Sequence, residues 1–285
     1  MGTATMTSSL HSVRSVDGTV IAYRVIGPTD ARPLVMLHGL AESLIVWGSV
    51  IETFAQRYRV VTPDLRGHGY SGKPESGYDD PANWAGDVAA VLAAEHITSG
   101  AVLLGWSYGG FALTDYLAES GSGVADGVVY VDAITGLGPG VLGGQIGPAM
   151  RDAMRDVIPA VFDEDGMRAI HAYSRVAEAG IYGAASGPDV QRLIGTSLMT
   201  PPRVRKALMT RPPRDNETTL RALTVPTLII HGLDDTIVLP DTARHLGEAI
   251  PHARVSLWEN TAHAPFLEDP GRFTTEITEF IEGLR

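Results

Sequence analysis

The chain has 285 residues, of which 44% are hydrophobic and 19% charged, the balance of a globular protein with a core of ordinary size. It contains no cysteine, which excludes disulfides, thiolate nucleophiles, iron–sulfur clusters and cysteine zinc sites. The formal net charge of −11 argues against nucleic-acid binding, because an acidic surface repels phosphate backbones.

Two features bear on where the chain resides. No run approaches the roughly 18 consecutive apolar residues of a membrane span, so no transmembrane helix is expected. Residues 1–9 are rich in Ser and Thr and lack both a basic flank and an apolar run, so we interpret them as a loose N-terminal tail and not as a secretory signal. Together with the absence of cysteine, these features favour a cytoplasmic protein.

Beyond the tail, short apolar runs alternate with helical patterns. Residues 10–15 and 19–25 flank Asp17-Gly18, a strong turn signal, and are predicted to form a hairpin. Because strands then alternate with helices, we expect an α/β fold with a mostly parallel central sheet and helices on both faces. The further predicted strands are 34–37, 60–62, 102–104, 128–131, 227–230 and 255–258, and the predicted helices are 84–95, 108–118, 241–250 and 271–283.

Residues 134–214 interrupt this alternation. They begin with a glycine-rich stretch and continue without a convincing strand. We predict that this stretch is a helical cap inserted into a single core domain, which is formed by residues 10–133 and 215–285. The predicted cap helices are 150–161, 166–179, 189–198 and 202–208.

Ser107 is predicted to be a nucleophile. It lies in Gly105-Trp106-Ser107-Tyr108-Gly109, a G-x-S-x-G pattern that directly follows a predicted strand and directly precedes a predicted helix. The pattern is short, and this context makes it informative. A sharp strand-to-helix turn lifts the serine hydroxyl clear of the sheet and aims the first free N–H groups of the helix at the space beside it.

A serine hydroxyl is a weak nucleophile at neutral pH and needs a base. His263 is the predicted base, because its loop follows the last strand at the sheet edge where the other strands also end. Pro265, two residues later, is expected to prevent a regular helix through this loop. An adjacent carboxylate should orient the imidazole and stabilise the imidazolium.

Three aspartates could supply this carboxylate. Asp235 is preferred, because it follows the strand 227–230. Asp234 is the first alternative, although neighbouring side chains point in different directions and only one should reach His263. Asp132, after the strand 128–131, is the second alternative.

Acyl transfer also needs donors for the developing oxyanion. The N–H of Tyr108 follows the nucleophile and begins the helix, so it is the first predicted donor. The second is the N–H of Leu40, in the loop after strand 34–37, where Gly39 allows the backbone to fold tightly. His38 is expected to brace this loop.

These motifs resemble the α/β-hydrolase superfamily, in which the nucleophile, acid and base follow one another in the order Ser, Asp, His. The resemblance extends from His38-Gly39 through the segment 63–71 and Val225-Pro226 to the segment 263–266. It implies an α/β-hydrolase fold and a loop-bracing role for three polar side chains, Asp64, Arg66 and His68. The chain is most similar to single-domain bacterial esterases and to the cofactor-free haloperoxidase-like (perhydrolase) group.

The sequence therefore predicts a carboxylic-ester hydrolase that acts on small, apolar substrates through an acyl-enzyme on Ser107 and needs no metal or organic cofactor. Lactone hydrolysis, C–C bond hydrolysis and perhydrolysis are compatible with the same residues. A non-catalytic, ligand-binding member of the fold is the remote alternative. Trp106 and the cap side chains Met154 and Phe162 are predicted to line the substrate pocket, although the apolar cap residues could instead form the cap's own core.

Overall fold

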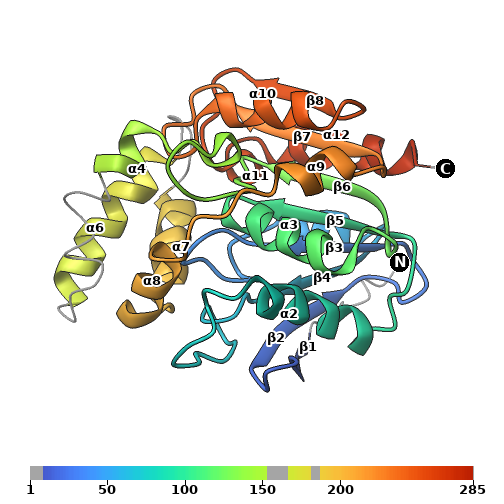
Figure 1. Cartoon of the computed structure of the whole chain (residues 1–285), viewed down its shortest axis with the longest axis horizontal. Helices are drawn as coiled ribbons and strands as arrows, with labels where there is room; N and C mark the ends of the chain where they lie inside the picture. The colour runs from blue at the N-terminus through green and yellow to red at the C-terminus, as the bar shows by residue number, and fades with distance from the viewer. Residues whose placement is uncertain (1–8, 153–165, 181–186, 285) are drawn as a thin grey trace, which may run out of the picture.

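The computed structural model describes residues 9–152, 166–180 and 187–284. Within them, eight strands form one sheet in the order β1-β2-β4-β3-β5-β6-β7-β8 (Figure 1). The first two strands form the predicted hairpin, β2 pairs antiparallel with β4, and every later pairing is parallel. The strands are β1 (Ser9–Arg14), β2 (Val20–Ile26), β3 (Pro33–Leu37), β4 (Arg59–Pro63), β5 (Ala101–Trp106), β6 (Ala125–Val131), β7 (Thr227–Gly232) and β8 (Arg254–Trp258). The predicted mostly parallel sheet is confirmed.

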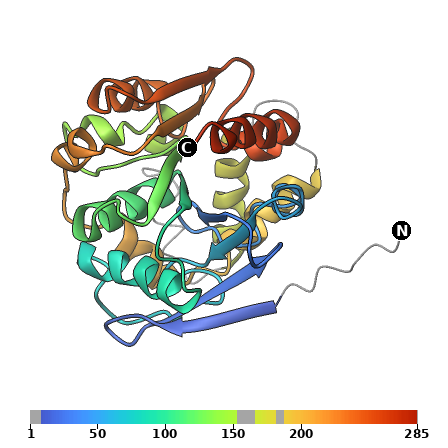
Figure 2. The same cartoon turned by 90° about the vertical axis from the view of Figure 1, so that its right-hand side faces the viewer.

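Helices cover both faces of this sheet, as Figure 2 shows. One layer contains α2 (Pro81–Ala94), α3 (Tyr108–Ser120), α9 (Glu217–Ala222) and α10 (Pro240–Ala249), and the other contains α1 (Val50–Phe54), α11 (Pro265–Glu268) and α12 (Pro270–Glu282). Side chains of the central strands alternate between the two cores. Leu103 packs in the first and Leu104 in the second, which is the period of two that a strand imposes.

Between β6 and α9, the described residues form helices joined by loops, and these helices lie beyond the carboxyl ends of the strands. The elements are η1 (Leu142–Gly144), α4 (Pro148–Asp152), α6 (Gly166–Ala179), α7 (Gly187–Ser197) and α8 (Pro202–Met209). The main chains of Leu137 and Arg214 exchange two hydrogen bonds, which bring the ends of this segment together. We call residues 134–214 the cap. None of the helices in the described ranges combines the length and hydrophobicity that a bilayer crossing needs.

One expectation about local structure is wrong. Pro265 does not keep the loop after β8 free of helix, because it is the first residue of α11. At that position a proline loses no helical hydrogen bond, since the first N–H groups of a helix have no partner within it. The helix ends after four residues. Two other short helices, α1 and α9, also escaped prediction because each is too short to establish a hydrophobic period.

Candidate active site

Ser107 occupies a strained turn between β5 and α3. Its φ of 53° and ψ of −121° form a conformation that residues with a side chain rarely adopt. Three main-chain hydrogen bonds hold it there. The N–H of Ser107 donates to the oxygen of Val131 (3.0 Å), and its own oxygen accepts from Gly110 (3.0 Å) and Ile134 (3.2 Å). The neighbouring strand and helix therefore fix the orientation of the hydroxyl.

Glycine is required on both sides of this serine. A Cβ atom on Gly105 would lie 2.6 Å from the main-chain oxygen of Gly109. A Cβ atom on Gly109 would lie 2.2 Å from the main-chain oxygen of Leu37 on β3. Both distances are far shorter than van der Waals contact, so the turn can pack against β3 only without side chains at these two positions.

The structure brings Ser107, His263 and Asp235 together. Nε2 of His263 lies 3.0 Å from Oγ of Ser107, and Nδ1 of the same ring lies 2.7 Å from Oδ2 of Asp235. The loops after β5, β8 and β7 supply these residues, so all three side chains meet at the carboxyl edge of the sheet. Ser107 is 9% exposed and Asp235 only 2%. Asp235 is therefore the more deeply buried end of the hydrogen-bonded series Ser107–His263–Asp235.

Local hydrogen bonds orient the Asp235 carboxylate. Its Oδ1 atom accepts from the N–H groups of Ile237 (2.8 Å) and Val238 (3.0 Å), which leaves Oδ2 facing His263. Burial alone would raise the pKa of Asp235, but His263 and His231 outweigh it and hold that pKa well below its usual range. Asp235 is therefore an ionised carboxylate.

The two alternative acids lie elsewhere. Asp234 is exposed, and its main-chain N–H donates to the oxygen of Thr261. Asp132 is fully buried and has a φ of 41°, and its Oδ1 atom accepts from the N–H of Gly232 at 2.8 Å. Neither carboxylate takes the place that Asp235 has beside the imidazole.

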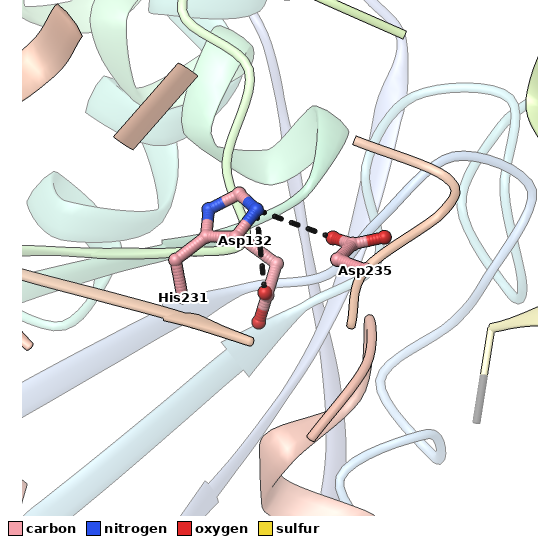
Figure 3. A group of neighbouring side chains, drawn as sticks. All are labelled: Asp132, His231 and Asp235. Atoms are coloured by element: carbon pink, nitrogen blue, oxygen red, sulfur yellow. Dashed lines mark ion pairs between the residues drawn. The ribbon is translucent and has the colours of Figure 1, made fainter. Parts of the chain in front are cut away.

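A second histidine lies behind Asp235, and sequence analysis did not single it out. Figure 3 shows His231 between Asp132 and Asp235, with Nε2 3.7 Å from Oδ1 of the former and 3.4 Å from Oδ2 of the latter. Although burial opposes it, the two carboxylates raise the pKa of His231. His231 is the last but one residue of β7, and its position directly after the predicted strand 227–230, in the same segment as Asp235, is the available signal.

The same three side chains could in principle hold a metal ion. Each offers one ligand atom, and these atoms lie within 4.8 Å of one another. However, Oδ2 of Asp235 is already bonded to His263, and the Nε2–H of His231 donates to the main-chain oxygen of Val238 at 3.1 Å. An ion would have to displace both hydrogen bonds, so we interpret the group as a buried hydrogen-bonding network.

Tyr108 and the loop that carries Leu40, which hold the predicted oxyanion donors, both adjoin Ser107. Tyr108 is the first residue of α3. The loop after β3 packs directly against the nucleophile, because a Cβ atom on Gly39 would lie 3.2 Å from Cβ of Ser107. Leu40 follows Gly39 in that loop. The arrangement therefore places two main-chain segments beside the hydroxyl.

His38 braces this loop, as expected. Its Nδ1–H donates to the oxygen of Gly39 (2.9 Å), and its Nε2 accepts from the N–H of Leu65 (3.0 Å). Burial lowers the pKa of His38 to about 4, so the ring is neutral at physiological pH and the Nε2 lone pair stays available.

The three polar residues of the segment after β4 also hold loops in place. Asp64 accepts hydrogen bonds from the N–H groups of Leu44 and Tyr70, both 2.6 Å long. Arg66 is fully buried and forms two hydrogen bonds of 2.7 Å with Asp87. His68 donates through Nδ1 to the oxygen of Arg66 (2.8 Å). These contacts are structural.

Trp106, which is predicted to line the substrate pocket, is buried and contacts the histidine loop. The indole is 3% exposed, its Nε1–H donates to the main-chain oxygen of His263 at 2.7 Å, and its ring packs edge-on against Phe266. Trp106 therefore holds the histidine loop from within the core. The other two predicted pocket residues, Met154 and Phe162, lie outside the described residues.

Residues 34–276 match the model of the alpha/beta hydrolase family, and the chain belongs to that family. The resemblance and fold class inferred from the sequence are thereby confirmed. An esterase from Rhodococcus sp. ECU1013, whose crystal structure is known, is 47% identical in sequence to this chain. The two structures superpose with a TM-score of 0.91, over 97% of this chain and 100% of the esterase. The family and this likeness identify the chain as a hydrolase.

Two curated relatives match this chain over most of its length. A non-heme chloroperoxidase from Streptomyces lividans is 30% identical, over 96% of this chain and 100% of the relative. A pimeloyl-[acyl-carrier protein] methyl ester esterase from Aliivibrio salmonicida is 26% identical, over 89% of this chain and 93% of the relative. The relatives thus support an ester hydrolase and leave its substrate open.

Proposed function

We propose that the protein hydrolyses carboxylic esters of small, apolar substrates through an acyl-enzyme on Ser107. One observation carries the proposal: the two hydrogen bonds that run from Oγ of Ser107 through His263 to Asp235, of 3.0 and 2.7 Å. A nucleophile bonded to a base that is itself oriented by a carboxylate is the arrangement that activates a serine. The similarity to an esterase at 47% identity supports the ester as the bond cleaved.

In the proposed acylation step, Nε2 of His263 accepts the hydroxyl proton while Oγ of Ser107 attacks the ester carbonyl. The ionised Asp235 keeps the other ring proton on Nδ1 and stabilises the imidazolium that forms. The N–H groups of Tyr108 and Leu40 donate to the oxyanion of the tetrahedral intermediate. His263 then gives its proton to the departing alcohol, which leaves an ester on Ser107.

Deacylation repeats these steps with water. His263 removes a proton from a water molecule, whose oxygen attacks the acyl carbonyl under the same two N–H donors. The imidazolium returns the proton to Oγ as the carboxylic acid leaves. All proton transfers pass through one histidine, so the proposed cycle requires no metal or organic cofactor.

The experiment that tests the proposal compares Ser107→Ala with the unchanged protein on a short-chain p-nitrophenyl ester. We expect kcat to fall by about 10³-fold or more, because the covalent step is lost. Ser120→Ala, at the exposed far end of α3, is the matched control and should keep full activity. A loss of only a few-fold in Ser107→Ala would overturn the proposal, as would failure of a fluorophosphonate to label Ser107.

Perhydrolysis is the second candidate, and the 30% identity to a non-heme chloroperoxidase favours it. In that reaction hydrogen peroxide takes the place of water, attacks the acyl-enzyme and leaves as a peracid, while Oγ of Ser107 regains a proton. Bromination of a phenol dye in acetate, bromide and peroxide measures the peracid. Bromination that Ser107→Ala abolishes would support this activity. A panel of acyl-chain lengths and lactones, assayed in parallel, ranks the remaining substrate classes.

A further inference from the structure

Glu42 is a buried carboxyl group that joins the core to the cap. It lies in the loop after β3, three residues beyond Gly39, and is 7% exposed. Its Oε1 atom accepts a hydrogen bond from Oγ of Ser197 (3.0 Å), and its Oε2 atom is hydrogen-bonded to Oγ1 of Thr196. Both hydroxyls belong to the last turn of α7, so two consecutive cap residues hold one core side chain.

A third cap hydroxyl holds the residue before it. Oγ1 of Thr200 donates to the main-chain oxygen of Ala41 at 3.4 Å. Ala41 has a φ of 60°, in the left-handed region that residues with a side chain adopt only when their surroundings impose it. The N–H of Glu42 donates to the oxygen of Gly39 (3.2 Å), which closes a tight turn around Leu40 and Ala41.

The protonation state of Glu42 suits this role. Burial raises the pKa of Glu42 to about 8, so the group is mostly a neutral acid at pH 7, able both to donate and to accept. The main-chain oxygen of Arg192 lies 2.9 Å from Oγ1 of Thr196. The hydroxyls of Thr196 and Ser197 both donate to Glu42, one to each carboxyl oxygen.

The turn that is held in this way carries a proposed oxyanion donor. Leu40 lies between Gly39, whose backbone packs against Ser107, and the strained Ala41. His38 fixes the turn from the core side through its bond to the oxygen of Gly39. Glu42 fixes it from the cap side. Without one of these two attachments, the strained residue would relax and carry the neighbouring peptide with it.

We propose that Glu42 is a positioning residue that fastens the turn 39–42 to α7 and thereby holds the N–H of Leu40 at the oxyanion. The inference rests on the proposed function, because it presupposes acyl transfer at Ser107. In this proposal both the core and the cap form the oxyanion hole. The core supplies the N–H of Leu40, and the hydroxyls of Thr196, Ser197 and Thr200 in the cap hold the turn that carries it.

A positioning role predicts a specific kinetic change. Displacing an oxyanion donor weakens an interaction made in the transition state, so kcat should fall while KM changes little. Glu42→Ala should lower kcat on the p-nitrophenyl ester about 10- to 100-fold and change KM by less than about threefold. Glu42→Gln should restore kcat to within a few-fold, because an amide has the same shape and both donates and accepts.

The cap side of the contact gives an independent variant. The double substitution Thr196→Val with Ser197→Ala removes both hydroxyls and should lower kcat as Glu42→Ala does. Adding Glu42→Ala to it should cause little further loss, since all three groups act through one contact. Glu52→Ala, an exposed glutamate on α1, is the matched control and should leave kcat unchanged. Thermal unfolding of every variant shows whether it is folded under assay conditions.

The outcomes separate this inference from the proposed function. An unchanged kcat in Glu42→Ala, or a raised KM with kcat intact, would overturn the positioning role. An equal loss in Glu42→Gln and Glu42→Ala would do the same. If Glu42→Ala fails to fold, the double variant Thr196→Val with Ser197→Ala provides the test. Full activity of that double variant would overturn the inference. Activity that survives Ser107→Ala would instead overturn the proposed function itself.

Discussion

The Nε1–H of Trp106 donates a 2.7 Å hydrogen bond to the main-chain oxygen of His263, so the residue before the proposed nucleophile holds the proposed base. The two rings also lie 5.6 Å apart, centroid to centroid. On its other side, the N–H of His263 donates to the oxygen of Gly180 at the end of α6 (3.0 Å). The core and the cap thus each bind one main-chain group of this histidine.

Replacing Trp106 with Phe tests the first of these attachments. The change keeps an aromatic ring and leaves the buried oxygen of His263 without its donor, which should cost about 1–3 kcal/mol. We expect kcat/KM on the p-nitrophenyl ester to fall about tenfold as the imidazole loses its position. Trp47→Phe is the matched control, because Trp47 is equally buried and its Nε1 finds no acceptor among the described residues. Similar kinetic losses in both variants would show that packing alone matters.

The choice of acid is tested by three isosteric substitutions. Asp235→Asn should lower kcat about 10⁴-fold, because an amide beside Nδ1 no longer keeps the ring in the tautomer that accepts the serine proton. Asp234→Asn changes an exposed neighbour and should leave kcat within twofold. Asp132→Asn should have an intermediate effect, since it acts through His231. A larger loss in Asp234→Asn or Asp132→Asn than in Asp235→Asn would reassign the acid.

Buried neutral histidines should make the protein sensitive to acid. Burial, reinforced by the neighbouring His38, lowers the pKa of His68 to about 3, from an ordinary value of 6.5. As the pH falls below 6.5, the unfolded chain therefore binds a proton that the folded chain does not. The free energy of unfolding should then decrease by up to about 1.4 kcal/mol per pH unit until the pH nears 3.

Urea unfolding of His68→Asn between pH 7 and pH 4 measures this effect. Asn retains a donor for the oxygen of Arg66 and cannot titrate, so the variant should show a slope shallower by about 1.4 kcal/mol per pH unit. His11→Asn, which changes an exposed histidine of β1, is the matched control. Parallel slopes for all three proteins would contradict the assignment.

Glu42 should have the opposite dependence. Burial raises the pKa of Glu42 to about 8 in the folded chain, from the ordinary value of 4.5 that we expect in the unfolded chain. Between these two pH values, only the unfolded chain releases the proton. The free energy of unfolding should fall as the pH rises from 4.5 to 8 and level off above it, because the unfolded state binds fewer protons. His263 is the ionisable neighbour whose charge acts on Glu42.

Glu42→Gln removes this dependence. Relative to the unchanged protein, the variant should gain up to about 1.4 kcal/mol of stability per pH unit across that range. Denaturant unfolding at pH 5, 6, 7 and 8 measures the difference in the free energy of unfolding between the two proteins. Glu52→Gln, which makes the same change at an exposed glutamate, is the control. A constant difference between the two proteins at all four pH values would mean that Glu42 is ionised throughout.

Much of the candidate site could be predicted because its residues lie on local patterns. Ser107 lies on a strand–turn–helix whose glycines are visible in the sequence, and His263 follows a recognisable strand. The sequence does not distinguish Asp235 from Asp234 as clearly. Asp235 is oriented by hydrogen bonds from the N–H groups of Ile237 and Val238, and these bonds depend on the path of the loop.

Other features depend on tertiary contacts that no local pattern carries. A glutamate is usually exposed, and Glu42 is buried where it contacts Thr196 and Ser197 of α7, which lie 154 and 155 positions later. Trp106 also makes a contact that the sequence does not reveal. Its partner is the main-chain oxygen of His263, 157 positions away, and a main-chain acceptor leaves no trace in the sequence.

The order of the strands has a consequence for how activity is gained during folding. Ser107 and its strained turn belong to the strands at the centre of the sheet, whereas the acid and base follow β7 and β8, which extend one edge. The serine and the histidine are 156 positions apart, so the chain must close a very long loop before the two meet. Recovered esterase activity in a refolding experiment therefore reports the docking of the C-terminal strands, and it should lag behind the burial of Trp84 and the other aromatic residues of the first helix layer.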